Sequence, residues 1–176
     1  MYWSTHSLLS SVTLIDTPGT NAVAELNHDA LTKRLLPSAD VVLFVTSCDQ
    51  PVSESERELL RLVRGWGKKT VVVLNKMDVL EDGKQRELVK KFVEEKVGEI
   101  FDQKVEVIMV SARRALRGKV LASRELLPAD AGVGAGDYLL SGFVELEEKL
   151  KSVLSEDNKI MHKLLSPVSG ERGEGE

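Results

Sequence analysis

Cysteine is scarce in this chain of 176 residues, and long hydrophobic runs and an excess of positive charge are missing from it. The single cysteine, Cys48, excludes an internal disulfide and fits a reducing compartment. No run approaches the roughly 18 apolar residues of a membrane-spanning helix, and the start shows no signal peptide or lipidation motif. Lysine and arginine number 24 against 28 acidic residues, a net charge of −4, which gives no global signal for nucleic acid binding.

Metal-ligand spacing is absent as well. The three histidines, His6, His28 and His162, are scattered along the chain and form no pattern typical of a metal centre. What is present is an ordinary globular composition, with 42% hydrophobic and 30% charged residues. The length is that of about one domain, enough to bury a core.

Apolar runs alternate with helical patterns along the chain. A capping box at Ser53 and Glu56 opens one expected helix, apolar residues at helical spacing predict a second over Gln85–Phe101, and Ser141 is a candidate cap for a last helix. Strands alternating with helices imply right-handed crossovers, so we expect an α/β fold with a mostly parallel sheet flanked by helices. The apolar runs that predict strands are Val12–Ile15, Val41–Val45, Thr70–Leu74 and Val105–Val110.

The sequence Asn75-Lys76-Met77-Asp78 directly follows the expected strand Thr70–Leu74. A carboxylate at Asp78 can accept two hydrogen bonds from the ring N–H and the exocyclic amine of guanine, a donor pair that adenine lacks. Asn75 can bond the opposite edge of the base, and the stem of Lys76 can lie over the ring. The alternative is a polar loop whose Asn and Asp cap the next helix.

A second polar loop, Asp16-Thr17-Pro18-Gly19, follows the expected strand Val12–Ile15. In a nucleotide site Asp16 would hold Mg²⁺ through water, and the amide of Gly19 would bond the γ-phosphate because no side chain blocks its approach. Taken alone, this pattern is better explained as an ordinary turn, since Pro and Gly favour turns everywhere.

A third loop, Ser111-Ala112, follows the expected strand Val105–Val110, and a backbone N–H there can bond the guanine carbonyl oxygen. By itself the dipeptide is nearly uninformative. The three loops nevertheless occur in order, each after its own apolar strand, at the edge where open α/β sheets bind ligands. Together they predict a domain that binds guanine nucleotides.

At these residues the chain resembles a GTPase domain of the translation-factor-related dynamin superfamily. More narrowly, it is similar to the fuzzy-onions-like, dynamin-related GTPases of plant and algal chloroplasts. The core motifs that carry the resemblance are Leu14–Gly19, Ala39–Val45, Leu74–Asp78 and Val110–Arg113, and the longer similar stretches are Leu14–Asn21, Ser38–Glu58 and Ser141–Lys149.

The resemblance implies binding of GTP or GDP with Mg²⁺, hydrolysis stimulated by dimerisation of G domains, and membrane remodelling in the chloroplast, at the thylakoid or the envelope. It assigns Mg²⁺, through water, to Asp16. The implied nucleotide contacts are Asp16, Gly19, Asn75, Lys76, Asp78, Ser111 and Ala112.

The chain departs from the family at the phosphate site. The pattern G-x-x-x-x-G-K-[ST], whose amides and lysine hold phosphates, does not occur. Gly67-Lys68-Lys69-Thr70 lacks the upstream glycine and leads into a strand, where that loop must lead into a helix. We therefore assign no catalytic residue and expect this chain alone to be inactive as a GTPase. We also expect it to be unstable alone, because a sheet without its first strands exposes an apolar edge.

The expected organisation is an N-terminal segment over residues 1–10, the C-terminal two-thirds of a dynamin-type G domain over 11–155, and a tail over 156–176 that is disordered at its end. Contact with membranes would come only through parts outside this chain. Two other interpretations remain open: part of a cytoplasmic GTPase of the ribosome-assembly or translation type, and a guanine-binding or protein-interaction module that has lost catalysis.

Overall fold

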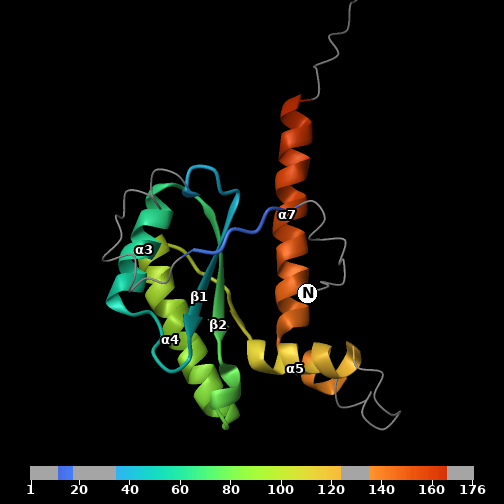
Figure 1. The fold of residues 1–176 in the computed structure, drawn as a ribbon. Helices are drawn as coiled ribbons and strands as arrows, with labels where there is room; N and C mark the ends of the chain where they lie inside the picture. Colours follow the sequence, from blue (N-terminus) through green and yellow to red (C-terminus); the bar gives the residue numbers. More distant parts are fainter. Residues whose placement is uncertain (1–11, 18–34, 124–134, 166–176) are drawn as a thin grey trace, which may run out of the picture.

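The computed structural model describes residues 12–17, 35–123 and 135–165, and the fold is given for these residues. Its centre is a parallel sheet in the order β1-β2-β3 (Figure 1). The strands are β1 (Val41–Ser47), β2 (Lys69–Asn75) and β3 (Val107–Met109). This confirms the predicted α/β class and the parallel sheet flanked by helices.

Helices cover the sheet on its two faces. On one side lie α3 (Glu54–Gly65) and α4 (Gly83–Phe101), and on the other stands α7 (Phe143–Leu165), which extends beyond the sheet (Figure 1). A single 3₁₀ turn, η3 (Met77–Val79), follows β2, and α5 (Ala112–Ser123) follows β3. The helix α5 had not been predicted from the sequence.

The apolar core has two parts because the central strand β2 alternates its side chains between both faces. Val72 and Leu74 point toward α3 and α4, whereas Val71 and Val73 point toward α7. Each fully buried Val or Leu contributes about 1.5–3 kcal/mol to stability. The side facing α3 and α4 contains Phe44, Cys48, Val52, Leu60, Val72, Leu74, Val93, Val97 and Val107, and the side facing α7 contains Val71, Val73, Ile108, Val110 and Leu146.

The strand β1 is covered on one face only within the described residues. Phe44 and Thr46 are buried, but Leu43 and Val45 on the other face are 37% and 50% exposed. The continuous apolar run Val41–Val45 is typical of a strand covered on both faces. The difference arises because, within the described residues, β1 lies at the edge of the sheet beside β2, and α7 packs mainly on β2 and β3.

Side chains near the starts of α3, α4 and α7 satisfy free backbone N–H groups there. The backbone N–H of Ser53 donates to the Glu56 carboxylate at 2.7 Å, as the predicted capping box requires. Asp82 caps α4 by accepting the N–H of Lys84 at 3.0 Å, and Phe143 N–H donates to the Ser141 hydroxyl at 3.2 Å at the start of α7. The predicted role of Ser141 as a helix cap is therefore confirmed.

The strand predicted over Val12–Ile15 is wrong: residues 12–17 adopt no regular structure, and Leu14 and Ile15 are 75% and 51% exposed. A strand exists only where its backbone groups find a neighbouring strand, and no ladder in the described residues includes this segment. The strand predicted over Val105–Val110 shortens to Val107–Met109.

Two helical segments complete the description. Residues 135–139 are helical, and α7 continues to Leu165, into the segment 156–176 expected as a tail. The N-terminal segment 1–10 and the end of the tail, 166–176, lie outside the described residues.

Candidate guanine-recognition site

Three loops meet at the carboxyl edge of the sheet and are joined by backbone hydrogen bonds. The loop after β1 reaches the loop after β2 through Cys48 N–H, which donates to the Asn75 carbonyl at 3.0 Å. The loop after β2 reaches the end of β3 through Met77 N–H, which donates to the Val110 carbonyl at 3.1 Å. These bonds bring together residues that the sequence separates by 27 and 33 positions.

Asp78 is fixed by the loop after β3. The Ser111 hydroxyl, fully buried, donates a 2.5 Å hydrogen bond to Asp78 Oδ1 and in turn accepts the N–H of Arg114 at 3.1 Å. The bond from Ser111 lowers the pKa of the Asp78 carboxyl below its usual value, with smaller contributions from the positive charges of Arg113 and Arg114. Asp78 is therefore held in the ionised form, which accepts hydrogen bonds.

The side chain of Asn75 links the same two loops. Its Oδ1 accepts the backbone N–H of Lys76 at 2.7 Å and that of Ala112 at 3.1 Å. With the oxygen engaged twice, the amide nitrogen is the part of Asn75 left to donate to a ligand. The Ala112 N–H, expected to bond a guanine carbonyl, is directed at Asn75 in this structure.

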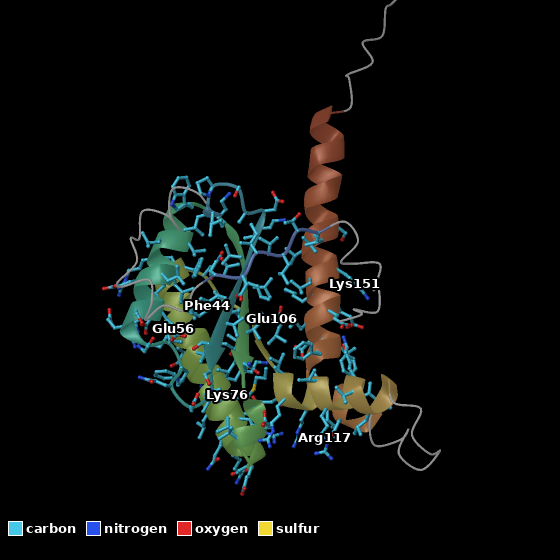
Figure 2. All side chains as sticks on the ribbon, in the orientation of Figure 1. Phe44, Glu56, Lys76, Glu106, Arg117 and Lys151 are labelled. Atoms are coloured by element: carbon cyan, nitrogen blue, oxygen red, sulfur yellow. The ribbon has the colours of Figure 1, made fainter. Side chains whose placement is uncertain are left out.

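Lys76 has an unusual backbone and a defined side-chain partner. Its φ of 66° and ψ of 28° lie in the left-handed region, which is uncommon for a residue other than glycine. Its Nζ lies 3.0 Å from Oδ2 of Asp49, in the loop after β1. Figure 2 shows Lys76 at the end of the sheet from which α5 departs.

Asp49 was not identified from the sequence. It accepts a hydrogen bond from the Ser47 hydroxyl as well as the ion pair from Lys76, and these two interactions lower its pKa to about 2, the bond from Ser47 having the larger effect. No sequence motif identifies Asp49, because Lys76, the residue with which it pairs, is 27 positions away in the chain. Its place just after a predicted buried strand was the one available signal.

The turn Ser141-Gly142 also supports the site and was missed as such. The Ser141 carbonyl accepts the N–H of Ser111 at 2.8 Å, which ties the loop after β3 to the start of α7. Gly142 has a φ of 76°, and a Cβ added there would lie 2.0 Å from the carbonyl oxygen of Met109. Only glycine allows this close approach.

The structure thus brings together five of the seven residues predicted to contact the nucleotide. Asp16 is exposed and makes no hydrogen bond or ion pair with these five in the described part of the chain. Gly19 lies outside the described residues. Within the ranges that the structure describes, no group of three His, Cys, Asp or Glu side chains could hold a metal ion. The five residues brought together are Asn75, Lys76, Asp78, Ser111 and Ala112.

Comparison with known proteins relates the chain to GTPases. The model of the dynamin family matches residues 1–77. A protein of Arabidopsis thaliana, named as a probable transmembrane GTPase, FZO-like and chloroplastic, is 35% identical over 173 residues, 92% of this chain and 18% of its own length. An uncharacterised GTP-binding protein of Methanocaldococcus jannaschii is 33% identical over 97 residues, 55% of this chain and 22% of its own.

A third relative, the tRNA modification GTPase MnmE of Thermotoga maritima, is 33% identical over 82 residues, which is 44% of this chain and 18% of that protein. The chain therefore spans about a fifth of the length of each of these relatives. Among the residues described here, none of the helices has the length and apolar character needed to cross a membrane.

Proposed function

We propose that the carboxyl edge of the sheet recognises the guanine base of GTP or GDP. The premise is that this chain is part of a G domain of the dynamin superfamily. The observation that carries the proposal is the bond between Ser111 and Asp78. It fixes an ionised carboxylate beside the loop that bears Asn75 and Lys76, in the form that guanine requires.

Each group has a distinct role in this proposal. Asp78 accepts hydrogen bonds from the ring N–H and the exocyclic amine of guanine, and the Asn75 amide nitrogen donates to the opposite edge of the base. The stem of Lys76 packs on the ring face. The Ala112 N–H exchanges its bond to Asn75 Oδ1 for one to the guanine carbonyl oxygen, so base binding repositions the Asn75 side chain.

This chain offers fewer groups to bind the phosphates and Mg²⁺ than to bind the base. Asp16 presents an exposed carboxylate, which suits a contact to Mg²⁺ through water, and Gly19 would supply an amide to the γ-phosphate. A single carboxylate cannot replace the amide cradle and lysine of a phosphate loop, whose pattern the sequence lacks. Most of the affinity of this chain should therefore come from the base.

The name of the Arabidopsis relative supports a wider role. We propose that the protein to which this chain belongs is a dynamin-like GTPase of the chloroplast that acts on membranes, with G domains that dimerise. In that protein the residues described here would supply selectivity for guanine.

The decisive test exchanges the hydrogen-bonding character of Asp78. Asp78→Asn replaces one carboxylate oxygen, an acceptor, by an amide nitrogen, a donor. The amide no longer matches the two donors of guanine, but it matches xanthine, whose ring carries a carbonyl in place of the amine. We expect the variant to lose affinity for guanosine and gain affinity for xanthosine, measured by NMR titration of the whole chain. Glu81→Gln, at an exposed acid nearby, is the matched control and should change neither.

Adenosine provides the specificity control. Equal binding of adenosine and guanosine by the unmodified chain would count against base recognition. So would an Asp78→Asn variant that keeps its preference for guanosine.

A further inference from the structure

We propose that Asp49 is a positioning residue of the base site, which holds the Lys76 amine so that the lysine stem lies across the guanine ring. The proposal rests on the proposed function and assigns a role that the four-residue motif itself does not contain. It would make the loop after β1 a part of base recognition.

The direct contact is an ion pair between loops from neighbouring strands. Lys76 Nζ and Asp49 Oδ2 are 3.0 Å apart, and both side chains are 53% exposed. The Ser47 hydroxyl donates to Oδ1 of the same carboxylate, so each of the two Asp49 oxygens has its own partner. A carboxylate with both oxygens engaged is a fixed anchor, whereas a lone surface acid is not.

The loop that bears Asp49 is itself rigidly held. The Thr46 hydroxyl, buried in the core, accepts the backbone N–H of Val52 at 3.1 Å. Val52 is 2% exposed and has a φ of 55°, a rare conformation for a β-branched residue that persists only where the surroundings enforce it. Cys48, adjacent to Asp49, is bonded through its N–H to the Asn75 carbonyl.

The backbone of Lys76 is constrained in the same way. Its left-handed conformation is supported by the bond from its own N–H to Asn75 Oδ1. Three described residues other than glycine have a positive φ; of these, Lys76 is a partner in the ion pair and Val52 lies three positions after Asp49. Strain that gathers at one place in a fold indicates a preorganised site.

Anchoring matters because a lysine stem has many rotamers, and a base can stack only on the one that lies over it. With its amine held by Asp49, Lys76 presents its aliphatic carbons in one direction before the base arrives. Both partners are half exposed, so the effect is expected to be modest.

The test compares variants of the full chain with guanosine as the probe. Asp49→Asn should weaken guanosine binding by about 2- to 5-fold, the range expected for an exposed ion pair. Lys76→Met keeps an apolar stem and removes the amine. The double variant should bind no more weakly than Lys76→Met alone, because Asp49 acts only through the amine. Asp49→Glu should restore part of the affinity.

The matched control is Asp102→Asn, which breaks a second exposed ion pair, to Arg64, at the far end of α4. It should leave guanosine affinity unchanged. A second readout needs no ligand: NMR relaxation of the Lys76 side chain should show increased motion in Asp49→Asn and no change in Asp102→Asn.

The outcomes separate the two proposals. If the unmodified chain binds guanosine and Asp49→Asn alters neither affinity nor Lys76 motion, the positioning role is wrong and base recognition stands. Additive losses in the double variant would also overturn it. If the unmodified chain does not bind guanosine, the base site as proposed fails, and with it the role of Asp49 in recognition.

Discussion

The Ser111 hydroxyl donates a 2.5 Å hydrogen bond to the Asp78 carboxylate, although the two residues are 33 positions apart in the sequence. The bond joins the end of β3 to the loop after β2 and leaves Asp78 ionised. It joins the Asn75–Asp78 and Ser111-Ala112 motifs into one hydrogen-bonded unit. Its effect on the pKa of Asp78 can be measured.

Ser111→Ala should raise the pKa of Asp78 toward the ordinary value of 3.8, because the largest cause of its depression is removed. A carboxyl with a depressed pKa stabilises the fold above its unfolded pKa, and this contribution is lost as the pH falls through the folded pKa. The variant should therefore be less stable than the unmodified chain above the unfolded pKa of Asp78, and this difference should shrink as the pH falls through the depressed pKa.

The measurement is a carboxyl NMR titration combined with acid unfolding curves. Ser155→Ala, which removes an exposed hydroxyl bonded to the Ser152 carbonyl, is the control and should leave the Asp78 titration unchanged. An Asp78 pKa that is the same in Ser111→Ala would show that the bond is not formed in solution.

Gly142→Ala should destabilise the chain and loosen the loop after β3. The left-handed φ of 76° alone costs a residue with a side chain about 1–2 kcal/mol, and the contact with the Met109 carbonyl adds to this. Gly65→Ala is the matched control, since a Cβ there meets nothing within 4 Å and Gly65 is the last residue of α3. It should be neutral or stabilise by up to about 1 kcal/mol.

Denaturant unfolding of both variants gives the comparison. Amide exchange at Ser111 reports the local effect, because its N–H is bonded to Ser141 next to the substitution. Equal stabilities for Gly142→Ala and Gly65→Ala would mean that the turn relaxes away from Met109.

Cys48 should react slowly with iodoacetamide. It is buried, and burial together with the negative charges of Asp49 and Asp78 raises the pKa of its thiol from 9.0 to about 11. The thiolate is the nucleophile, so at pH 8 the reactive fraction should be about 100-fold smaller than for an unperturbed thiol. Because the folded pKa is raised, stability should fall as the pH rises from about 9 to about 11.

Alkylation followed by mass spectrometry is unambiguous here, since the chain contains one cysteine. The rate should rise to that of an ordinary thiol in denaturant. Rapid modification under native conditions would indicate that the loop after β1 opens.

The rate of GTP hydrolysis by this chain alone should be no higher than the rate in buffer without protein. The sequence has no phosphate-loop pattern, and the amides and lysine of that loop are the groups that would stabilise charge on the transferring phosphoryl group. Release of inorganic phosphate from GTP with Mg²⁺ measures this directly. Turnover that disappears in Asp78→Ala would contradict the expectation.

Predictions from the sequence were most successful where the signal was local. The continuous apolar run of β2, the capping box of α3 and the apolar spacing of α4 each depend on residues close together in the chain, and each was confirmed. The failure at Val12–Ile15 has the opposite cause, because an apolar run becomes a strand only when another strand is beside it.

The sequence by itself determined the α/β class, the central strands and the residue types that suit a guanine base, since these follow from neighbours along the chain. Only the tertiary structure decided that Ser111 bonds Asp78, that Asp49 pairs with Lys76 and that Gly142 lies against Met109. Those contacts depend on which loops meet at the edge of the sheet. The meeting is fixed by the packing of β1, β2, β3 and α7, so the segment Asn75–Asp78 acquired its geometry from residues outside it.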